Sequence, residues 1–247
     1  MRLVETAEEV QLNEAATGYT MTMPAPGVFA QLQSNMAATL NIDWVLSLAS
    51  GILASQGITR TNGEMITLVD QWIASSEPAS LIYQPYVSEA GERGPFVDAN
   101  ARAGFVGISS RHGYADMVRA VFEGLAFAAR DCYAAMGPLP REIRLTGGAA
   151  RSPALRRILG AAIGADVRTS AREEAGAAGA AMIAAVCVGL YPSIDECVAE
   201  WVTPLLGEAE PSDPELAAVY EKIAPSYTLA HQALRPVWRS MAATKAN

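Results

Sequence analysis

The sequence predicts an α/β fold in which helices cover a sheet. In residues 142–190, apolar segments of strand length alternate with segments of helical character, in the order strand, helix, strand, helix. Residues 104–108 form a further candidate strand, and residues 116–136 carry apolar side chains at helical spacing. Because such alternation places helices against the faces of one sheet, we expect a layered α/β domain.

We expect this domain to cover residues 1–206 and to be followed by a helical tail over residues 207–247. The tail opens with an acidic, proline-containing turn and continues as a helix over 215–238 that Pro225 interrupts. The other expected elements are paired short strands at 7–12 and 19–23, helices at 30–55 and 63–73 (the second capped by Thr61 or Asn62), a strand at 81–87, strands at 142–145 and 166–169, and helices at 153–162, 174–190 and 192–206.

Composition and charge exclude several classes of partner. The 247 residues are 51% hydrophobic and 18% charged, as in ordinary globular chains, and the formal net charge is −8. An acidic surface disfavours nucleic acid and anionic membranes as main partners, but it permits a small phosphorylated ligand. Residues 1–9 lack the apolar core of a signal peptide, and no apolar run reaches the ~18 residues that span a bilayer. We therefore expect a cytoplasmic protein, and homo-oligomerisation stays open.

The cysteines and histidines show no pattern of a metal or catalytic site. Cys132, Cys187 and Cys197 have neither CxxC nor metal-ligand spacing, so we expect buried, reduced thiols, which suits the cytoplasm. His112 and His231 have no serine or carboxylate at a triad-like spacing, so we expect surface or packing positions for both. No metal ligand and no catalytic residue is assigned.

The turn after the 142–145 strand is the first candidate for ligand binding. Gly147 and Gly148 can adopt positive φ angles and let a ligand approach the backbone closely. Ser152 is a good N-cap and Pro153 suits the first helical position, so the free amides of a helix start would face a ligand at the glycines. The alternative is that the glycines only allow a tight strand-to-helix turn.

Two further segments have competing interpretations. Ser170 and Glu173 form a capping-box pattern before a helix rich in Ala and Gly, which predicts either a functional helix start or tight packing against a neighbour. The loop over 88–100 contains several carboxylates and arginines, which could act as acid and base or could form a salt-bridged loop.

Four segments carry short motifs that occur together in one protein family. They are Gly91-Glu-Arg-Gly-Pro-Phe-Val-Asp-Ala-Asn-Ala-Arg102; Ala103-Gly-Phe-Val-Gly107-Ile108, followed after seven residues by Asp116-Met-Val-Arg-Ala-Val-Phe-Glu123; Gly147-Gly148-Ala-Ala-Arg-Ser152; and Glu174-Ala-Gly-Ala-Ala-Gly-Ala-Ala181. In this order they resemble the C-terminal domain of the FGGY family of carbohydrate kinases, over about residues 10–205. The sequence of residues 84–96 most resembles the erythritol kinase branch of the family, with xylulose-type kinases as the neighbouring option.

The resemblance implies an actin-like ATPase (ribonuclease H-like) fold with a mixed sheet flanked by helices. Gly148 and Ser152 match family positions that contact adenosine, beside Gly147, and Gly107 matches a glycine near the nucleotide phosphates. The implied reaction is transfer of the γ-phosphoryl group of ATP, with Mg²⁺, to a sugar or polyol hydroxyl. The implied partners are an adenine nucleotide and a carbohydrate.

The chain also departs from the family pattern. The family's general base is an aspartate in a Gly-Asp-Gln or Gly-Asp-Asn context, and no such tripeptide occurs here. We therefore expect the chain to be the nucleotide-binding part of a longer kinase and to be inactive alone. The alternatives are a non-catalytic actin-like half-domain that binds a nucleotide or a partner, and a dinucleotide binder, for which the GxGxxG spacing is missing.

Overall fold

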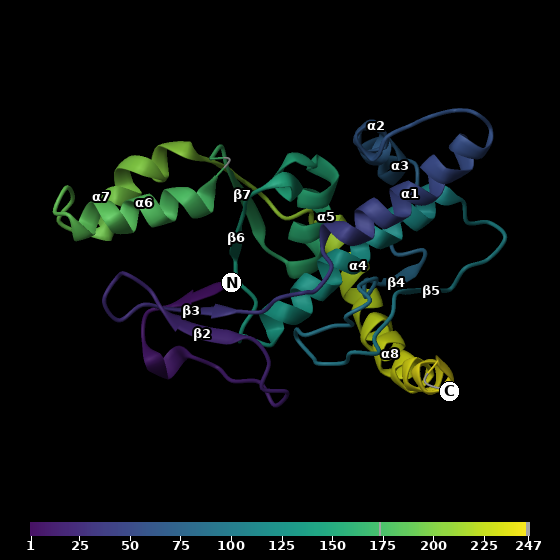
Figure 1. Ribbon diagram of the computed structural model, residues 1–247, viewed down its shortest axis with the longest axis horizontal. Coiled ribbons are helices and arrows are strands. Elements are labelled where there is room, and N and C mark those ends of the chain that lie inside the picture. Colours follow the sequence, from purple (N-terminus) through teal and green to yellow (C-terminus); the bar gives the residue numbers. More distant parts are fainter. Residues whose placement is uncertain (173, 246–247) are drawn as a thin grey trace.

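The computed structural model describes residues 1–172 and 174–245, except for the side chains of Ala149 and Lys245. Figure 1 shows a long molecule with α4 at its centre, the α6–α7 pair projecting at one end and the C-terminal part of α8 at the other. The helices are α1 (Thr39–Ser55), α2 (Asn62–Met65), α3 (Val69–Ala74), α4 (Tyr114–Ala134), α5 (Pro153–Ile163), α6 (Ala175–Cys187), α7 (Ile194–Trp201) and α8 (Pro214–Lys245). The strands are β1 (Arg2–Val4), β2 (Tyr19–Thr22), β3 (Phe29–Leu32), β4 (Ile82–Gln84), β5 (Gly104–Val106), β6 (Glu142–Leu145), β7 (Asp166–Ser170) and β8 (Leu206–Glu210).

The main core is built around α4. Its apolar positions recur at helical spacing, and Val118, Val121 and Phe122 are fully buried. The helices α1, α3 and α5 and the strand β4 all pack against α4. Buried Arg119 and Glu123 lie one turn apart on this helix and form an ion pair of 2.7 Å. We name this assembly of α1–α5, β4, β5 and α8 the body of the molecule.

The N-terminal region differs from its prediction. The expected pairing of 7–12 with 19–23 is wrong, because residues 7–9 form a single 3-10 turn and β2 pairs with β3 instead. The expected helix over 30–55 begins only at Thr39, because residues 29–32 form β3, the central strand of the sheet β1-β3-β2. Backbone pairing on both edges of this segment therefore outweighs its helical spacing of apolar residues.

The sheet β6-β7-β8 confirms two strands and corrects one segment. The expected strands at 142–145 and 166–169 are present as β6 and β7, which pair in parallel. The segment after residue 206, expected as an acidic turn, forms β8 antiparallel to β7. Its Glu210 side chain lies at the surface and forms a 2.8 Å ion pair with Arg156, which accounts for acidic residues in a strand. The expected helix over 192–206 is α7 followed by a 3-10 turn, η4 (Thr203–Leu205).

The C-terminal helix α8 runs without interruption through Pro225, contrary to prediction. Tyr220 and Tyr227 lie on either side of this proline and are buried against α4, where their hydroxyls donate to Glu123 Oε1 at 2.8 Å and to the Gly124 carbonyl at 3.3 Å. These anchors offset the backbone hydrogen bond that a proline removes. α8 shares the core of the body, and the division after residue 206 stays a prediction. Over residues 1–172 and 174–245, no helix combines the length and apolar character needed to cross a bilayer.

Candidate functional site

The glycine turn has the local structure that its sequence predicts. Gly147 has a φ of +76°, a conformation that favours glycine, and the chain then forms the 3-10 turn η3 (Gly148–Arg151). Ser152 caps α5 by accepting from the Leu155 amide at 3.2 Å, and Pro153 occupies the first turn. The turn therefore places the N-terminus of α5 directly after the two glycines.

One cavity lies between this turn and the helices α1, α3 and α4. Its volume is about 470 Å³. Apolar side chains from four separate segments form most of its walls, and two carboxylates lie at its border. We name it the helical cavity; its lining residues are Thr39, Ile42, Asp43, Ile66, Thr67, Val69, Asp70, Phe122, Gly148, Arg151, Ser152 and Leu155.

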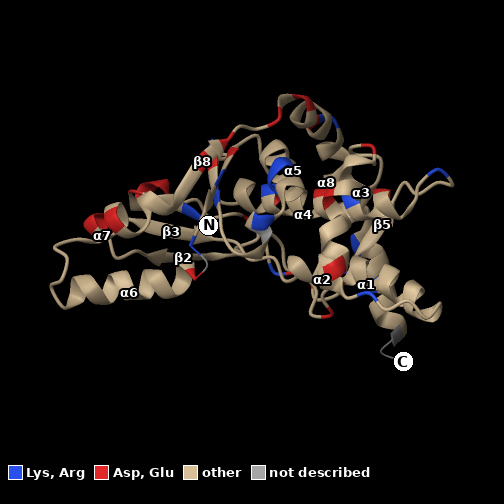
Figure 2. Ribbon diagram, turned by 90° about the horizontal axis from the view of Figure 1, so that it is seen from above, with Lys and Arg blue, Asp and Glu red and all other residues tan. Residues whose placement is uncertain are grey.

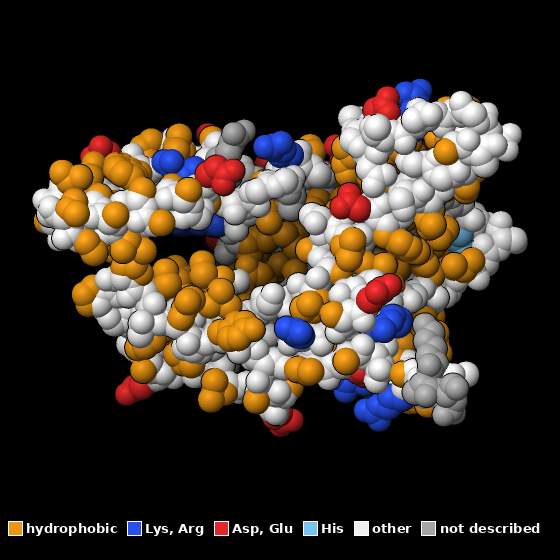
Figure 3. All heavy atoms as spheres, in the orientation of Figure 1, with side chains coloured by type: hydrophobic (Ala, Val, Ile, Leu, Met, Phe, Trp, Pro, Cys, Tyr) orange, Lys and Arg blue, Asp and Glu red, His pale blue; other side chains and the backbone are white. Residues whose placement is uncertain are grey.

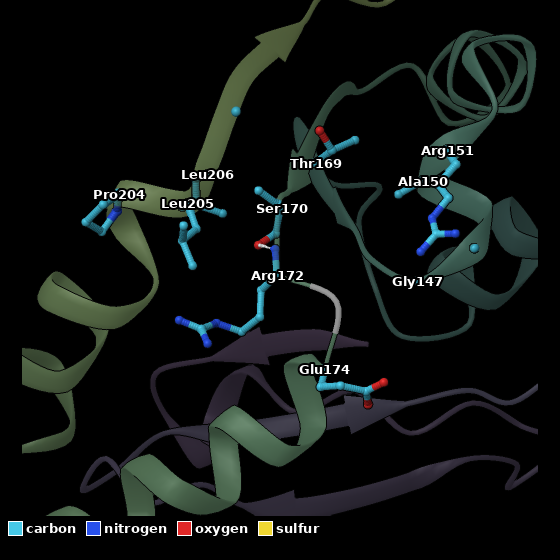
Figure 4. A pocket seen from close by; sticks show the side chains of 13 residues that line it. Gly147, Ala150, Arg151, Thr169, Ser170, Arg172, Glu174, Pro204, Leu205 and Leu206 are labelled. Carbon is cyan, nitrogen blue, oxygen red and sulfur yellow. Dashed lines mark hydrogen bonds between the residues drawn. The ribbon is translucent and has the colours of Figure 1, made fainter.

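A second, larger cavity of about 790 Å³ lies on the other side of the turn (Figure 4). It is bordered by the ends of β6 and β7, the approach to α6, and the η4–β8 connection. Figure 4 shows Arg172 and Arg151 on its two sides, with Ser170 and Thr169 between them. We name it the strand cavity; its lining residues are Gly147, Gly148, Ala150, Arg151, Thr169, Ser170, Ala171, Arg172, Glu174, Pro204, Leu205, Leu206 and Gly207.

Gly148 and Arg151 line both cavities, so the turn is the wall that they share. A Cβ atom placed on Gly148 would meet no atom within 4 Å. Packing therefore does not require glycine at this position, and the open space in front of its backbone belongs to the cavities. This observation favours a ligand-facing role over the alternative that glycine is needed only for a tight turn.

Asp70 of α3 joins the two sides of the helical cavity. Its Oδ1 accepts from the Ser152 hydroxyl at 3.2 Å and from the Ala154 amide at 3.4 Å. A carboxylate is favourable at the N-terminus of α5, where backbone N–H groups are otherwise unpaired. The hydroxyl of Ser152 is therefore held in place by a residue that sequence reasoning missed. No local sequence signal marks Asp70 or Ile66 as neighbours of residue 148, since only the folded chain brings them together.

Gly107 lies apart from this site. It follows β5 with a φ of +92°, and it lines neither the helical nor the strand cavity. Gly147, Gly148 and Ser152 are thus brought together, whereas the predicted contact of Gly107 with the nucleotide phosphates stays a prediction.

The loop over 88–100 has a structural rather than an acid–base arrangement. The Glu92 carboxylate is buried and accepts from the amides of Met36 at 2.9 Å and Arg93 at 2.8 Å. Burial raises the pKa of Glu92, against the opposing effect of these hydrogen bonds. Neither of the two expected arrangements, an acid–base pair or an ion-paired carboxylate, describes Glu92, because its partners are backbone amides. The loop therefore fixes the chain around β3 and α1.

The remaining candidates have packing roles. His231 lies 4.0 Å from Phe96 between ring centroids, and burial lowers the pKa of this histidine to about 4. Cys132 and Cys197 are buried as predicted, but Cys187 is exposed, because the outer face of α6 has no covering element. The Ser170 hydroxyl accepts from the Arg172 amide at 3.2 Å, while the expected capping partner Glu173 lies outside the described residues.

Comparison with known proteins identifies the family. The model of the FGGY family of carbohydrate kinases, C-terminal domain, matches residues 1–188. The chain belongs to this family. It is 54% identical over 237 residues to the erythritol kinase of Brucella abortus, covering 96% of this chain and 46% of that relative. It is 27% identical to the xylulose kinase of Escherichia coli over 82% of this chain and 40% of that relative. The chain thus spans about half the length of these kinases.

Solved structures of the same family share the fold. The ligand-bound xylulose kinase from Lactobacillus acidophilus superimposes with a TM-score of 0.80 over 97% of this FGGY chain, at 23% identity. The xylulose kinase from Rhodospirillum rubrum gives a TM-score of 0.74 over 90% of the chain. The predicted α/β class and actin-like architecture are confirmed by this likeness.

Proposed function

We propose that this chain is the nucleotide-binding part of an ATP-dependent polyol kinase, with the adenosine of ATP in the helical cavity. The observation that carries the proposal is that Gly148 and Ser152, the two positions matched to adenosine contacts, line the same largely apolar cavity. A planar base needs flat apolar walls and a few polar groups at the rim. Ile42 and Ile66 supply such walls, and Asp43 supplies a carboxylate at the rim.

The strand cavity is suited to the phosphates of the same nucleotide. It begins at the open backbone of Gly147 and Gly148, and Arg151 lines it together with Arg172. Arg172 adds a guanidinium, whose Nη2 donates to the Trp201 carbonyl while its Nε has no hydrogen-bond partner among the described residues. A nucleotide seated across Gly148 would therefore have its base among helices and its phosphates beside strand ends.

Mg²⁺ is proposed to arrive with the nucleotide. The residues that the structure describes hold no cluster of three or more His, Cys, Asp or Glu side chains that could bind a metal ion. When bound, the ion would neutralise the charge that develops on the phosphate oxygens during phosphoryl transfer. We propose that the phosphates of the nucleotide hold it, and no side chain of this chain is assigned to it.

The acceptor is proposed to be a polyol, with erythritol favoured by the 54% identity to an erythritol kinase. The sequence lacks the Gly-Asp-Gln or Gly-Asp-Asn tripeptide that carries the family's general base, so we propose that this base lies in the other half of the kinase. The chain alone should then show no turnover with ATP, Mg²⁺ and erythritol. The three cysteines are free, which supports a reducing, cytoplasmic setting.

A matched pair of substitutions tests the proposed adenosine site in the helical cavity. Ile66 and Leu68 lie in the same 3-10 turn and are similarly exposed, at 42% and 40%, but only Ile66 lines the helical cavity. By calorimetry, Ile66→Ser should weaken ADP binding by about three- to tenfold, because it removes part of an apolar wall. Leu68→Ser should leave binding within about twofold of the parent chain. Equal effects of the two substitutions would place the nucleotide elsewhere.

A further inference from the structure

We propose that a cavity between α4 and α8, beside Pro225, binds a small neutral polyol or sugar. The cavity has a volume of about 310 Å³, which is enough for a ligand of this size. Its lining shares no residue with the helical cavity or the strand cavity. A ligand here would therefore bind apart from the nucleotide, so the site goes beyond the proposed function and does not depend on it. We name it the α4–α8 cavity.

Two aromatic rings form the most buried part of the α4–α8 cavity. Phe127 of α4 and Tyr227 of α8 are 5% and 1% exposed, and their stacked rings have centroids 5.0 Å apart. The Tyr227 hydroxyl is already used, because it donates to the Gly124 carbonyl at 3.3 Å. The inner wall is therefore apolar, and it can pack against the C–H groups of a ligand.

Arg130 of α4 contributes a hydrogen-bond donor that lacks an acceptor. Its Nη2 pairs with Oε1 of Glu221 on α8 at 2.8 Å, whereas its Nη1 is buried and has no hydrogen-bond partner among the described residues. A buried N–H group that is left unpaired costs free energy. An oxygen atom of a ligand in the cavity would supply the missing acceptor.

Asp131, the next residue, contributes an acceptor that lacks a donor. It lines the same cavity, and no hydrogen bond to its carboxylate is found in the part of the chain that the structure describes. Burial raises the pKa of Asp131 to about 6, against the opposing charge of Arg130. A hydroxyl group of a ligand can donate to this carboxylate and so replace the water that it loses on folding.

The α8 side adds further acceptors at the rim of the cavity. Pro225 has no amide N–H, so it cannot donate to the carbonyl of Glu221 four residues earlier. Thr228 is exposed, and its hydroxyl donates to the Ala224 carbonyl at 3.3 Å, which leaves the hydroxyl oxygen able to accept. A ligand with several hydroxyl groups would therefore find partners at the rim as well as inside.

The combination of these groups selects a neutral ligand. An anion would pair with Arg130, but Asp131 and Glu221 would repel it. A cation would pair with Asp131 but would leave the donor of Arg130 unpaired. A hydroxyl group both donates and accepts, so neighbouring hydroxyls of one polyol can satisfy Arg130 and Asp131 together.

Surface charge supplies little selection by itself. Figure 3 shows acidic and basic side chains of the described residues interspersed over one face of the molecule, among many uncharged ones. Charges of both signs close together weaken the long-range attraction of an ionic ligand. We therefore expect hydrogen bonds within the cavity, rather than a charged surface, to determine what binds.

The test is calorimetry of the full 247-residue chain with erythritol as the polyol probe. We expect saturable one-to-one binding at millimolar concentration, unchanged by saturating ADP. Arg130→Met and Asp131→Ala should each weaken this binding by at least about fivefold, because each removes a hydrogen bond to a charged group. Arg157→Met is the matched control, since Arg157 also pairs with a carboxylate, that of Asp213 at 2.7 Å, but lies outside the cavity. Its affinity should stay within about twofold of the parent chain.

A variant at the rim repeats the test without touching a buried charge. Thr228→Val removes an exposed hydroxyl and should weaken erythritol binding about three- to tenfold. Inorganic phosphate and putrescine serve as anionic and cationic probes. Any heat that they give should be the same in the parent chain, Arg130→Met and Asp131→Ala.

The proposal fails if erythritol gives no saturable heat. It also fails if Arg130→Met, Asp131→Ala and Thr228→Val bind erythritol as well as the parent chain does, with unchanged circular dichroism. Binding of phosphate or putrescine that depends on Arg130 and Asp131, and that is tighter than binding of erythritol, would show that the cavity takes an ion. ADP calorimetry is independent of these outcomes, so a failure here leaves the nucleotide site standing.

Discussion

The two cavities that meet at Gly148 belong to different parts of the molecule. The helical cavity is set into the body, with the fully buried Phe122 among its lining residues. The strand cavity opens beside β6, β7 and β8 and the α6–α7 pair, which we name the arm. In the arm, α6 packs on α7, and the outward side chains Ile183 and Val188 remain exposed. One wall of the proposed site is therefore part of a closed core, whereas the other is not.

Charged residues lie on both parts of the molecule. Figure 2 shows arginines on α5, which belongs to the body, and carboxylates along β8 and α7 of the arm. In the body, the Arg119–Glu123 pair is buried and Glu123 also accepts from the Ala79 amide at 3.1 Å. This buried ion pair is therefore satisfied within the body. The arm has exposed apolar side chains on α6, and among the described residues its strand β6 pairs only with β7.

The largest effect should come from the floor of the helical cavity. Phe122→Ala removes a fully buried aromatic ring from α4 and should lower the free energy of unfolding by about 3–5 kcal/mol in urea titration. Leu206→Ala, in the lining of the strand cavity, should cost less than about 1.5 kcal/mol because this residue is only half-buried. Similar losses for the two would mean that both cavities belong to one core.

A pH-dependent effect should separate the body from the arm. Burial raises the pKa of Asp131 on α4 to about 6 from an ordinary value of 3.8, against the opposing effect of Arg130. Because the folded state holds this proton more tightly, the stability that Asp131 contributes is fully present below about pH 4 and is lost as pH rises through 6. Relative to Asp131→Asn, the parent chain should lose about 2 kcal/mol between pH 4 and pH 7 in urea titrations. In the arm, Arg168 lowers the pKa of Glu142, which is the opposite direction. If the difference in the free energy of unfolding between the parent chain and Asp131→Asn stays constant over this pH range, the raised pKa of Asp131 is contradicted.

The arm should open locally before the body unfolds. Met182 is 9% exposed and packs with Cys197 and Ala185 between α6 and α7. Met182→Ala should speed amide exchange over 175–187 by roughly tenfold, while the global unfolding midpoint changes little. Ile183→Ala, at an exposed position on the same helix, serves as the control and should change exchange less than about twofold. A shift of the global midpoint comparable to that of Phe122→Ala would mean that the arm and body unfold together.

The smallest effect should come from the phosphate side. Arg172→Ala removes a cation from the strand cavity and should weaken ADP binding about three- to fivefold, with adenosine binding unchanged. Arg168→Ala provides the control, because Arg168 lies outside the cavity lining and is paired with Glu142 at 2.8 Å. Equal weakening of ADP and adenosine by Arg172→Ala would show that this side chain supports the fold rather than the phosphates.

Local signals made part of this structure predictable. Gly147, Ser152 and Pro153 mark the end of β6 and the start of α5, and the structure begins and ends these elements within a residue of expectation. The strands β3 and β8 escaped prediction because strand pairing with distant partners, not local composition, determines them. The residues of α1 and α3 that line the helical cavity could not be predicted for the same reason, since they are remote in sequence from the glycine turn.

The central claim is that a nucleotide sits against Gly148, and ADP calorimetry on two glycine variants tests it most directly. Gly148 and Gly51 both have open space where a Cβ would lie, and neither has a positive φ, so a Cβ atom is tolerated at either position. Only Gly148 lines the two cavities. The account predicts measurable heat with millimolar ADP for the parent chain and for Gly51→Val, and its loss in a folded Gly148→Val. Undiminished ADP binding by Gly148→Val would contradict it.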